Sequence, residues 1–280
     1  MKAKKTEVIT ESGNVIIKNI TPLSLAQTLD CGQAFRWECD NNGIWHGIAF
    51  GKSLNLKQEN DCVTLLNTTK DEFEAIWRSY FDIDRDYAEI VKQVSKNKVI
   101  KTATDYAGGI RILKQEPWET LCSFIISQNN NIPRIKGIIG RLCQKFGQET
   151  ENGFTFPTAQ KIAECTIEDL AELRSGFRAR YIIDAAQKVA RKEIDIDKLF
   201  YCDIDEARAE LMKICGVGLK VADCTLLFGF GRIEAFPKDV WIKKALEKLF
   251  NGEIPTEAEE YAGIVQQYIF YYARETKLQL

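Results

Sequence analysis

The stretch CGVGLKVADC, residues 215–224, decides how the second half of the chain is expected to fold. Two glycines stand one residue apart within it, and apolar residues of helical period lie on both sides. Glycine at both positions permits positive φ and lets another backbone approach closely. The stretch therefore predicts two helices joined by a hairpin of Gly216, Val217 and Gly218, with the hairpin element in residues 211–224.

A hairpin of this kind is suited to bind a phosphate. Successive amides in such a turn form a concave anion site, and the second helix directs its positive dipole end toward the same place. A DNA phosphate, bound without regard to base sequence, is the natural ligand of such a helix–hairpin–helix. A purely structural turn between two helices is the alternative that the stretch alone leaves open.

Lys220 and Asp239 form a candidate catalytic pair. Lys220 lies in the first turn of the second helix, where the dipole disfavours a cation and favours the neutral amine that a nucleophile needs to form a Schiff base. Asp239 follows Pro237 at an expected helix start, where an isolated aspartate is a helix cap. Near a lysine, a carboxylate can also accept its proton, orient it and stabilise a cationic sugar.

Length and composition limit the classes of protein. The chain has 280 residues, 45% of them hydrophobic, and a formal charge of −2, so it is not a strongly basic DNA binder. Backbone amides and helix N-termini hold phosphates without such a charge. No apolar run could span a bilayer, and no secretory signal is apparent. We expect no membrane partner and a cytoplasmic protein, associated with the nucleoid if the source is bacterial.

Cysteine and histidine limit the cofactors. Nine cysteines, an odd number without a C-x-x-C pair, indicate reduced thiols rather than a disulfide framework or a zinc site. His46 is the only histidine, which excludes a multi-histidine metal site. We therefore expect no metal and no other cofactor.

The apolar period changes along the chain. Short apolar or alternating runs such as NVIIKNI and IWHGIAF, separated by turn clusters, predict a small antiparallel β domain in residues 1–95. From KDEFEAIWRSYF onward the period is helical, and Pro117 stands at an expected helix start. The expected fold class is α+β, with the β domain followed by a larger all-α helix–hairpin–helix domain in residues 96–280.

CGVGLKVADC and FPKDVW together resemble the helix–hairpin–helix-GPD superfamily of DNA glycosylases. More narrowly, the chain resembles the 8-oxoguanine DNA glycosylase/AP lyases of the type first known from eukaryotes. CGQAFRW, GGIRILKQEPWETLCSFIISQNNNIPRI, LRSGFRARYI and YAGIVQQYIF extend the resemblance over most of the chain in the family's order. Endonuclease-III-like relatives carry a four-cysteine iron–sulfur cluster after the catalytic aspartate. No cysteine follows Cys224 here, so that branch is excluded.

The resemblance implies an enzyme and its mechanism. Lys220 would attack C1′ of the damaged nucleotide, expel 8-oxoguanine and form the Schiff base that leads to strand cleavage by β-elimination. Asp239 would be the accompanying carboxylate, and Gly216, Val217 and Gly218 would hold the backbone phosphate. The expected partner is double-stranded DNA that contains 8-oxoguanine, and the enzyme is expected to act as a monomer.

A base pocket is also implied, because the target base has to leave the duplex to be reached. 8-Oxoguanine has an N7–H donor where guanine has an acceptor, and one backbone carbonyl can read this difference. The resemblance assigns that carbonyl to Gly32, the Watson–Crick edge to Gln266, and the two stacking surfaces to Phe270 and Cys224. From the residues alone, Gly32 is a turn glycine, and Phe270 and Cys224 are core residues.

The partner base left behind in the duplex is expected to be held by a second group of residues. By resemblance, Asn129 fills the vacated space, Arg134 and Arg178 donate to the estranged cytosine, and Phe177 wedges between neighbouring bases. Cytosine offers O2 and N3 acceptors there, so paired guanidinium donors favour it. Without the resemblance, each arginine is a solvated surface residue.

Three positions depart from the family pattern. Phe177 stands where many members have a tyrosine, which removes a hydroxyl contact and puts strict preference for cytosine in doubt. Trp241 stands where many have a histidine near the phosphate. Cys215 replaces a proline often found before the hairpin glycines, and we expect a looser turn.

Two other classes of function have to be weighed. A DNA-binding scaffold with an inactive helix–hairpin–helix predicts the loss of Lys220 or Asp239, and both are present. A monofunctional glycosylase for alkylated bases needs no lysine nucleophile, so Lys220 argues against it. The sequence therefore predicts a bifunctional base-excision-repair glycosylase and AP lyase.

Overall fold

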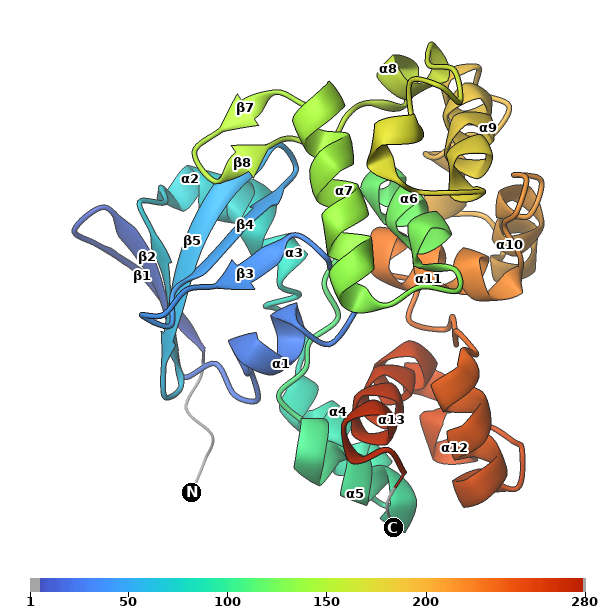
Figure 1. Ribbon diagram of the computed structural model, residues 1–280. Helices are drawn as coiled ribbons and strands as arrows, with labels where there is room; N and C mark the ends of the chain where they lie inside the picture. The colour runs from blue at the N-terminus through green and yellow to red at the C-terminus, as the bar shows by residue number, and fades with distance from the viewer. Residues whose placement is uncertain (1–5, 279–280) are drawn as a thin grey trace.

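The computed structural model describes residues 6–278 (Figure 1). Its first part is a six-stranded sheet in which every neighbouring pair is antiparallel. The strands lie in the spatial order β1 (Glu7–Glu11), β2 (Asn14–Lys18), β6 (Cys62–Leu66), β5 (Lys52–Glu59), β4 (Trp45–Ala49) and β3 (Trp37–Cys39).

One face of the sheet is buried. Alternate residues of β2, β5 and β6 are buried, as expected when one side of a strand packs on a core and the other meets water. Trp37, Trp77 and Tyr80 fill this core, and the Trp37 indole N–H donates to the Tyr80 hydroxyl at 2.7 Å. A small antiparallel β domain is therefore confirmed, with its strands within residues 7–66.

The remainder of the described chain is mainly helical. Its α-helices are α1 (Leu25–Leu29), α2 (Lys70–Glu72), α3 (Arg78–Tyr80), α4 (Tyr87–Val94), α5 (Lys98–Ala107), α6 (Pro117–Ser127), α7 (Ile132–Phe146), α8 (Ala159–Ala163), α9 (Arg178–Ala190), α10 (Ile204–Leu211), α11 (Leu219–Phe230), α12 (Val240–Phe250) and α13 (Ala262–Thr276). A short hairpin of β7 (Glu149–Thr150) and β8 (Gly153–Phe154) interrupts them. The larger helical domain is confirmed, while its boundary at residue 95 stays a prediction.

The helices form two lobes beside the sheet (Figure 1). One lobe contains α6 to α11, in which α11 packs on α6 and α9 packs on α8. The other lobe combines α4 and α5 with the C-terminal α12 and α13, so that segments far apart in sequence lie side by side. Within residues 6–278, no helix has the length and apolarity that crossing a bilayer requires.

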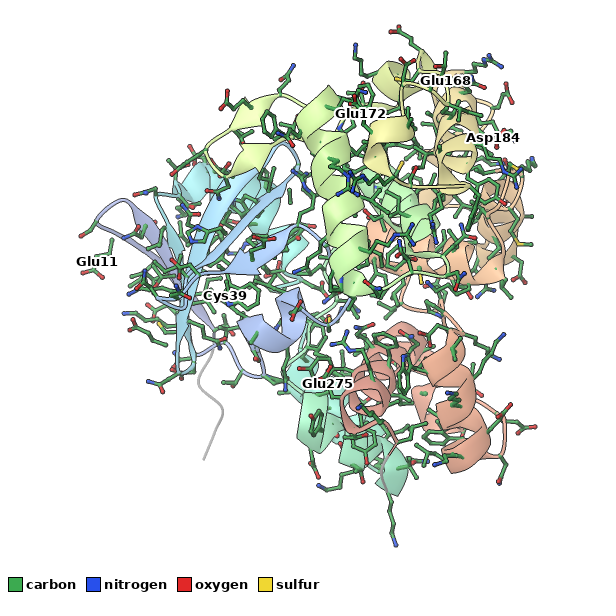
Figure 2. The ribbon with its side chains drawn as sticks, viewed as in Figure 1. Glu11, Cys39, Glu168, Glu172, Asp184 and Glu275 are labelled. Atoms are coloured by element: carbon green, nitrogen blue, oxygen red, sulfur yellow. The ribbon has the colours of Figure 1, made fainter. Side chains whose placement is uncertain are left out.

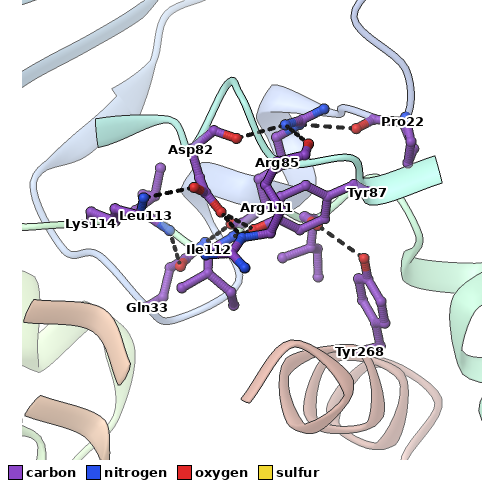
Figure 3. A network of polar contacts seen from close by, with 11 residues as sticks. Pro22, Gln33, Asp82, Arg85, Tyr87, Arg111, Ile112, Leu113, Lys114 and Tyr268 are labelled. Carbon is purple, nitrogen blue, oxygen red and sulfur yellow. Dashed lines mark hydrogen bonds and ion pairs between the residues drawn. The ribbon is translucent and has the colours of Figure 1, made fainter. Parts of the chain in front are cut away.

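Arg111 joins these parts (Figure 3). Only 3% of it is exposed, and its guanidinium donates to the carbonyls of Pro22, Asp82 and Arg85 at 3.2, 2.8 and 3.4 Å. Its Cζ lies 4.5 Å from the centre of the Tyr87 ring. One buried cation therefore satisfies backbone acceptors at Pro22, before α1, and in the turn before α4, and so ties both to the segment that carries residue 111.

We expect Arg111→Met to lower the free energy of unfolding by about 3 to 5 kcal/mol, because it leaves buried carbonyls without a donor. Urea denaturation followed by circular dichroism measures the loss. Arg78→Met is the matched control: Arg78 is a half-buried arginine paired with Glu74, and its loss is expected to cost less than about 1 kcal/mol. Equal losses in the two variants would contradict the assignment.

Candidate active site

A cavity of about 450 Å³ lies where the two helical lobes meet the β domain. The helices α6, α7, α11, α12 and α13 contribute to its wall, together with the turn after α1, the loop after α6 and the segment before α12. The cavity brings together six of the residues predicted from the sequence, namely Gly32, Lys220, Cys224, Asp239, Gln266 and Phe270.

The hairpin has the predicted backbone geometry. Gly216 has φ +78°, and a Cβ there would lie 2.4 Å from atoms of the Tyr181 ring. Val217 is 6% exposed and anchors the turn in the core. Gly218 is the N-cap of α11, and a Cβ on it would meet no atom within 4 Å. Gly216 is thus required by the fold, whereas the open space at Gly218 is available to a ligand.

We expect Gly216→Ala and Gly218→Ala to separate stability from DNA binding. Gly216→Ala adds strain at positive φ and a clash, so it should cost about 1 to 3 kcal/mol of stability. Gly218→Ala should leave the melting temperature nearly unchanged and weaken DNA binding about 5- to 10-fold, because its methyl group occupies the space of the phosphate. Thermal unfolding and fluorescence anisotropy with duplex DNA measure the two effects. A destabilised Gly218→Ala protein with unchanged DNA affinity would contradict this reading.

Cys215 contributes a bond that proline cannot make. Its backbone N–H donates to Oδ2 of Asp184 at 2.6 Å, and Lys188 Nζ lies 2.9 Å from the same oxygen. Asp184 projects from α9 beside the hairpin (Figure 2). The departure from proline thus comes with a tie to α9, which restrains the turn that we expected to be looser.

The Lys220 amine lies inside the cavity wall. Its Nζ is 3.4 Å from the Ser127 hydroxyl and 5.1 Å from the centre of the Phe124 ring. Both contacts are weak compared with a close ion pair. The amine is therefore held in place while keeping room for another reacting group. Ser127 was missed by the sequence reasoning, and the SQNNN motif that begins with it was the available signal.

Asp239 serves as a helix cap and also acts on Lys220. Its Oδ1 accepts the backbone N–H of Ile242 at 2.8 Å and so caps α12. Burial raises the pKa of this carboxyl above its ordinary value, while the Ile242 bond and the positive charge of Lys220 oppose the rise. The two interpretations of Asp239 considered from the sequence are therefore compatible.

The carbonyl of Gly32 differs from those around it. The carbonyls of residues 30, 31 and 33 accept side-chain hydrogen bonds at 3.3, 3.1 and 2.7 Å, and the donors are Arg274, Gln267 and Gln115. Among the residues that the structure describes, none donates to the Gly32 carbonyl. Gly32 lies at the cavity with φ +87°. A rigidly held turn thus leaves one acceptor free at the pocket.

Three further predicted residues line the pocket: Gln266 with a free acceptor, and Phe270 and Cys224 with apolar surfaces. Gln266 is 4% exposed; its Nε2 donates to the Pro237 carbonyl at 3.2 Å and its Oε1 has no partner within the described chain. Phe270 lies one helical turn further along α13. Burial raises the pKa of the Cys224 thiol to about 11, so it remains an uncharged surface.

The loop after α6 places the predicted gap-filling residues. Asn129 is exposed and has φ +47°, in the left-handed region. Arg178 is only 2% exposed, and its guanidinium donates to the carbonyls of Ser175, Gln128 and Asn129. In this state Arg178 holds the loop, and its direct contact with cytosine stays a prediction.

Arg134 and Phe177 are the accessible members of this group. Arg134 is exposed and donates weakly to the Arg174 carbonyl at 3.5 Å. Phe177 is 48% exposed, with the Arg178 guanidinium 4.4 Å from its ring centre and the Tyr181 ring edge-on at 5.7 Å. Tyr181 also packs on Gly216, so the exposed ring and the hairpin share one support.

A second groove continues from the cavity and includes Gly218, Lys220 and Asp239 in its wall. Trp241 lines both, with Lys244 Nζ 5.5 Å from its ring centre. The sequence reasoning left the role of Trp241 open. Its position on both surfaces puts it beside the path from the hairpin to the base pocket.

Comparison with known proteins matches two families along the chain. Residues 15–121 match the family described as 8-oxoguanine DNA glycosylase, N-terminal domain, and residues 122–265 match the HhH-GPD superfamily of base excision DNA repair proteins. An N-glycosylase/DNA lyase of Saccharomyces cerevisiae is 33% identical over 263 residues, which cover 82% of this chain and 69% of the relative. A probable N-glycosylase/DNA lyase of Methanothermobacter thermautotrophicus is 33% identical over 75% of this chain and 77% of its own length.

Two solved structures are similar over nearly the whole chain. MBOgg1, in complex with a low-affinity DNA ligand, has a TM-score of 0.92 and 41% identity over 98% of this chain and 100% of its own. The 8-oxoguanine glycosylase/lyase of Clostridium acetobutylicum, in complex with DNA that has cytosine opposite 8-oxoguanine, has a TM-score of 0.91 and 37% identity over 99% and 100%.

Proposed function

The chain belongs to the HhH-GPD superfamily of base excision DNA repair proteins, and on this premise we propose how its pocket removes 8-oxoguanine from duplex DNA. It is a bifunctional N-glycosylase and AP lyase. The single observation that carries the proposal is the free Gly32 carbonyl at a pocket that also contains Lys220 and the unpaired Oε1 of Gln266.

Recognition uses the two free acceptors. The Gly32 carbonyl accepts N7–H, a donor that 8-oxoguanine has and guanine lacks. Gln266 Oε1 accepts from the N1–H and amino group of the Watson–Crick edge. Phe270 and Cys224 enclose the faces of the base. Normal guanine would leave the Gly32 carbonyl opposite a lone pair, which disfavours its binding.

Chemistry follows from the pair on α11 and α12. The neutral Lys220 amine bonds to C1′ as the bond from C1′ to the base breaks and the base leaves with the bonding electron pair. Asp239, ionised until then, accepts the proton that the resulting ammonium loses and passes it to O4′ for the opening of the ring. The sugar ring then opens to the Schiff base, and loss of a C2′ proton expels the 3′ phosphate by β-elimination. The negative charge of Asp239 also stabilises the cationic sugar while the base departs.

DNA is held by the hairpin and by the loop after α6. Gly216, Val217 and Gly218 present the N-terminus of α11 to a phosphate. Asn129 and Phe177 enter the duplex where the base has left, and Arg134 donates to the estranged partner base. Arg178 supports this group by fixing the backbone of residues 128 and 129.

Single-turnover excision tests the proposal. Duplexes with 8-oxoguanine opposite each of the four bases, and a guanine duplex as control, are incubated with the protein and analysed for base release and strand cleavage. We expect release of 8-oxoguanine and no release of guanine. Equal rates at the two bases, or release without any trappable adduct, would refute the proposed recognition or the proposed nucleophile. The expectations of a monomer, of a cytoplasmic location and of no cofactor stay predictions.

A further inference from the structure

The cavity contains an unpaired donor that the proposed mechanism does not use. Among the described residues, Gln266 Oε1 and Arg274 Nη1 are buried side-chain atoms without a hydrogen-bond partner, and both residues line this cavity. Gln266 has a role in the proposed recognition, whereas Arg274 has none. Arg274 was also missed in the sequence, although it follows Gln266 and Phe270 at the same four-residue interval.

The Arg274 guanidinium is fixed on its other atoms. Its Nε and Nη2 each lie 2.8 Å from Glu275 Oε1, and Nη2 also donates to the Asp30 carbonyl at 3.3 Å. Its Cζ lies 5.6 Å from the centre of the Phe270 ring. Glu275 lies on α13 at the edge of the lower lobe (Figure 2). These contacts leave Nη1 without a competing partner among the described residues and hold the guanidinium near the rings of Phe270 and Tyr271.

Nη1 also lies next to Gly32, whose carbonyl reads N7–H in the proposed recognition. It is 3.4 Å from the position that a Cβ on Gly32 would take. A ligand atom beside the one bonded to the Gly32 carbonyl is therefore within reach of this donor. In the proposed recognition the Gly32 carbonyl binds N7–H. The base has two carbonyl oxygens near N7: O8 is on the adjacent ring atom C8, and O6 is on C6, one ring atom further away.

The helix order distinguishes these two oxygens. Gln266, Phe270 and Arg274 follow one another along one face of α13, about 6 Å apart per step. If Gln266 binds the N1 edge and Phe270 stacks on the middle of the base, Arg274 meets the opposite end of its long axis. That end is C8 with its oxygen, whereas O6 lies on the side of Gln266.

We propose that Arg274 is a specificity-determining residue whose Nη1 donates to O8 of the extruded 8-oxoguanine. This inference rests on the proposed function and adds a second contact that normal guanine cannot satisfy. With guanine in the pocket, Nη1 remains buried and unpaired, which costs binding free energy in addition to the mismatch at Gly32.

A substrate pair isolates this contact. One duplex contains 8-oxoguanine, and the other contains 8-thioxoguanine, which keeps N7–H but replaces O8 with sulfur, a weak acceptor. Single-turnover base release is measured for the wild type and for Arg274→Met. Compared with the wild type, we expect the variant to release 8-oxoguanine about 10- to 100-fold more slowly and 8-thioxoguanine less than threefold more slowly. The preference of the enzyme for 8-oxoguanine over 8-thioxoguanine should therefore decrease.

Controls separate this contact from folding and from the proposed function. β-Elimination at a preformed abasic site should be unchanged in Arg274→Met, since no base is present, and Arg78→Met should keep the wild-type preference. An equal slowing of both substrates in Arg274→Met, or no slowing of either, would overturn the inference. Wild-type protein that releases no 8-oxoguanine would instead refute the proposed function.

Discussion

Lys220→Gln is expected to abolish the covalent adduct with DNA and to slow base release by about 10⁴-fold or more. Glutamine has a similar length but no nucleophilic amine, so no bond to C1′ can form. The wild-type protein, mixed with an 8-oxoguanine duplex and borohydride, should give an adduct stable on a denaturing gel, because the reductant converts the Schiff base to an amine.

Loss of the adduct should not reflect unfolding. The Lys220 amine makes a long contact to Ser127 at 3.4 Å, lies 5.1 Å from the centre of the Phe124 ring, and forms no ion pair within 4 Å among the described residues. Its removal should therefore change stability little. Lys238→Gln is the matched control, since Lys238 lines the same groove and precedes Asp239. It should keep the adduct even if DNA binding weakens. An adduct from Lys220→Gln equal to that of the wild type would refute the assignment of the nucleophile.

Asp239→Asn is expected to slow base release by about 10²- to 10⁴-fold while DNA binding survives. Asparagine is as good a helix cap as aspartate and can accept the Ile242 N–H in the same way. The change therefore removes the negative charge and the proton acceptor but retains the cap. Comparable losses in DNA affinity and in rate would indicate a purely structural residue.

The same carboxyl gives a prediction about pH. Burial raises the pKa of Asp239, so base release should fall on the acid side at a pH above the ordinary aspartate value of about 3.9. An aspartate whose pKa is raised on folding costs stability as pH rises through its folded-state pKa, because ionisation is then favoured in the unfolded chain. At neutral pH Asp239→Asn should thus melt at the same temperature or higher, and a large drop in melting temperature would contradict this.

Several features could be predicted because their causes are local. The hairpin requires a glycine at positive φ in Gly216, and a pattern of two glycines between apolar helices indicates it directly. The cap at Asp239 follows from its place after Pro237. The grouping of Gly32 with Gln266 and Phe270 came from family resemblance, because no local pattern connects the turn after α1 to the last helix.

Other predictions concern donors whose bonds within the protein are visible only in the structure. Arg178 was assigned to cytosine, yet its guanidinium is occupied by three backbone carbonyls in the structure. Cys215 was expected to loosen the turn, yet its N–H binds Asp184, 31 residues away. A sequence shows which hydrogen-bond donors and acceptors each residue has, but it does not show which of them are paired with each other in the folded protein.

The amino-acid sequence alone therefore specified the chemical groups: a lysine behind a glycine hairpin, a capping carboxylate and the family to which they belong. Only the tertiary structure decided which polar atoms remain free. The turn at Gly32 and the Arg274 guanidinium are held by hydrogen bonds from Gln267 to Cys31 and from Arg274 to Asp30. The partners in these bonds are 236 and 244 positions apart in the sequence. Whether a polar atom is satisfied depends on its neighbours in space, and these are set by packing rather than by local sequence.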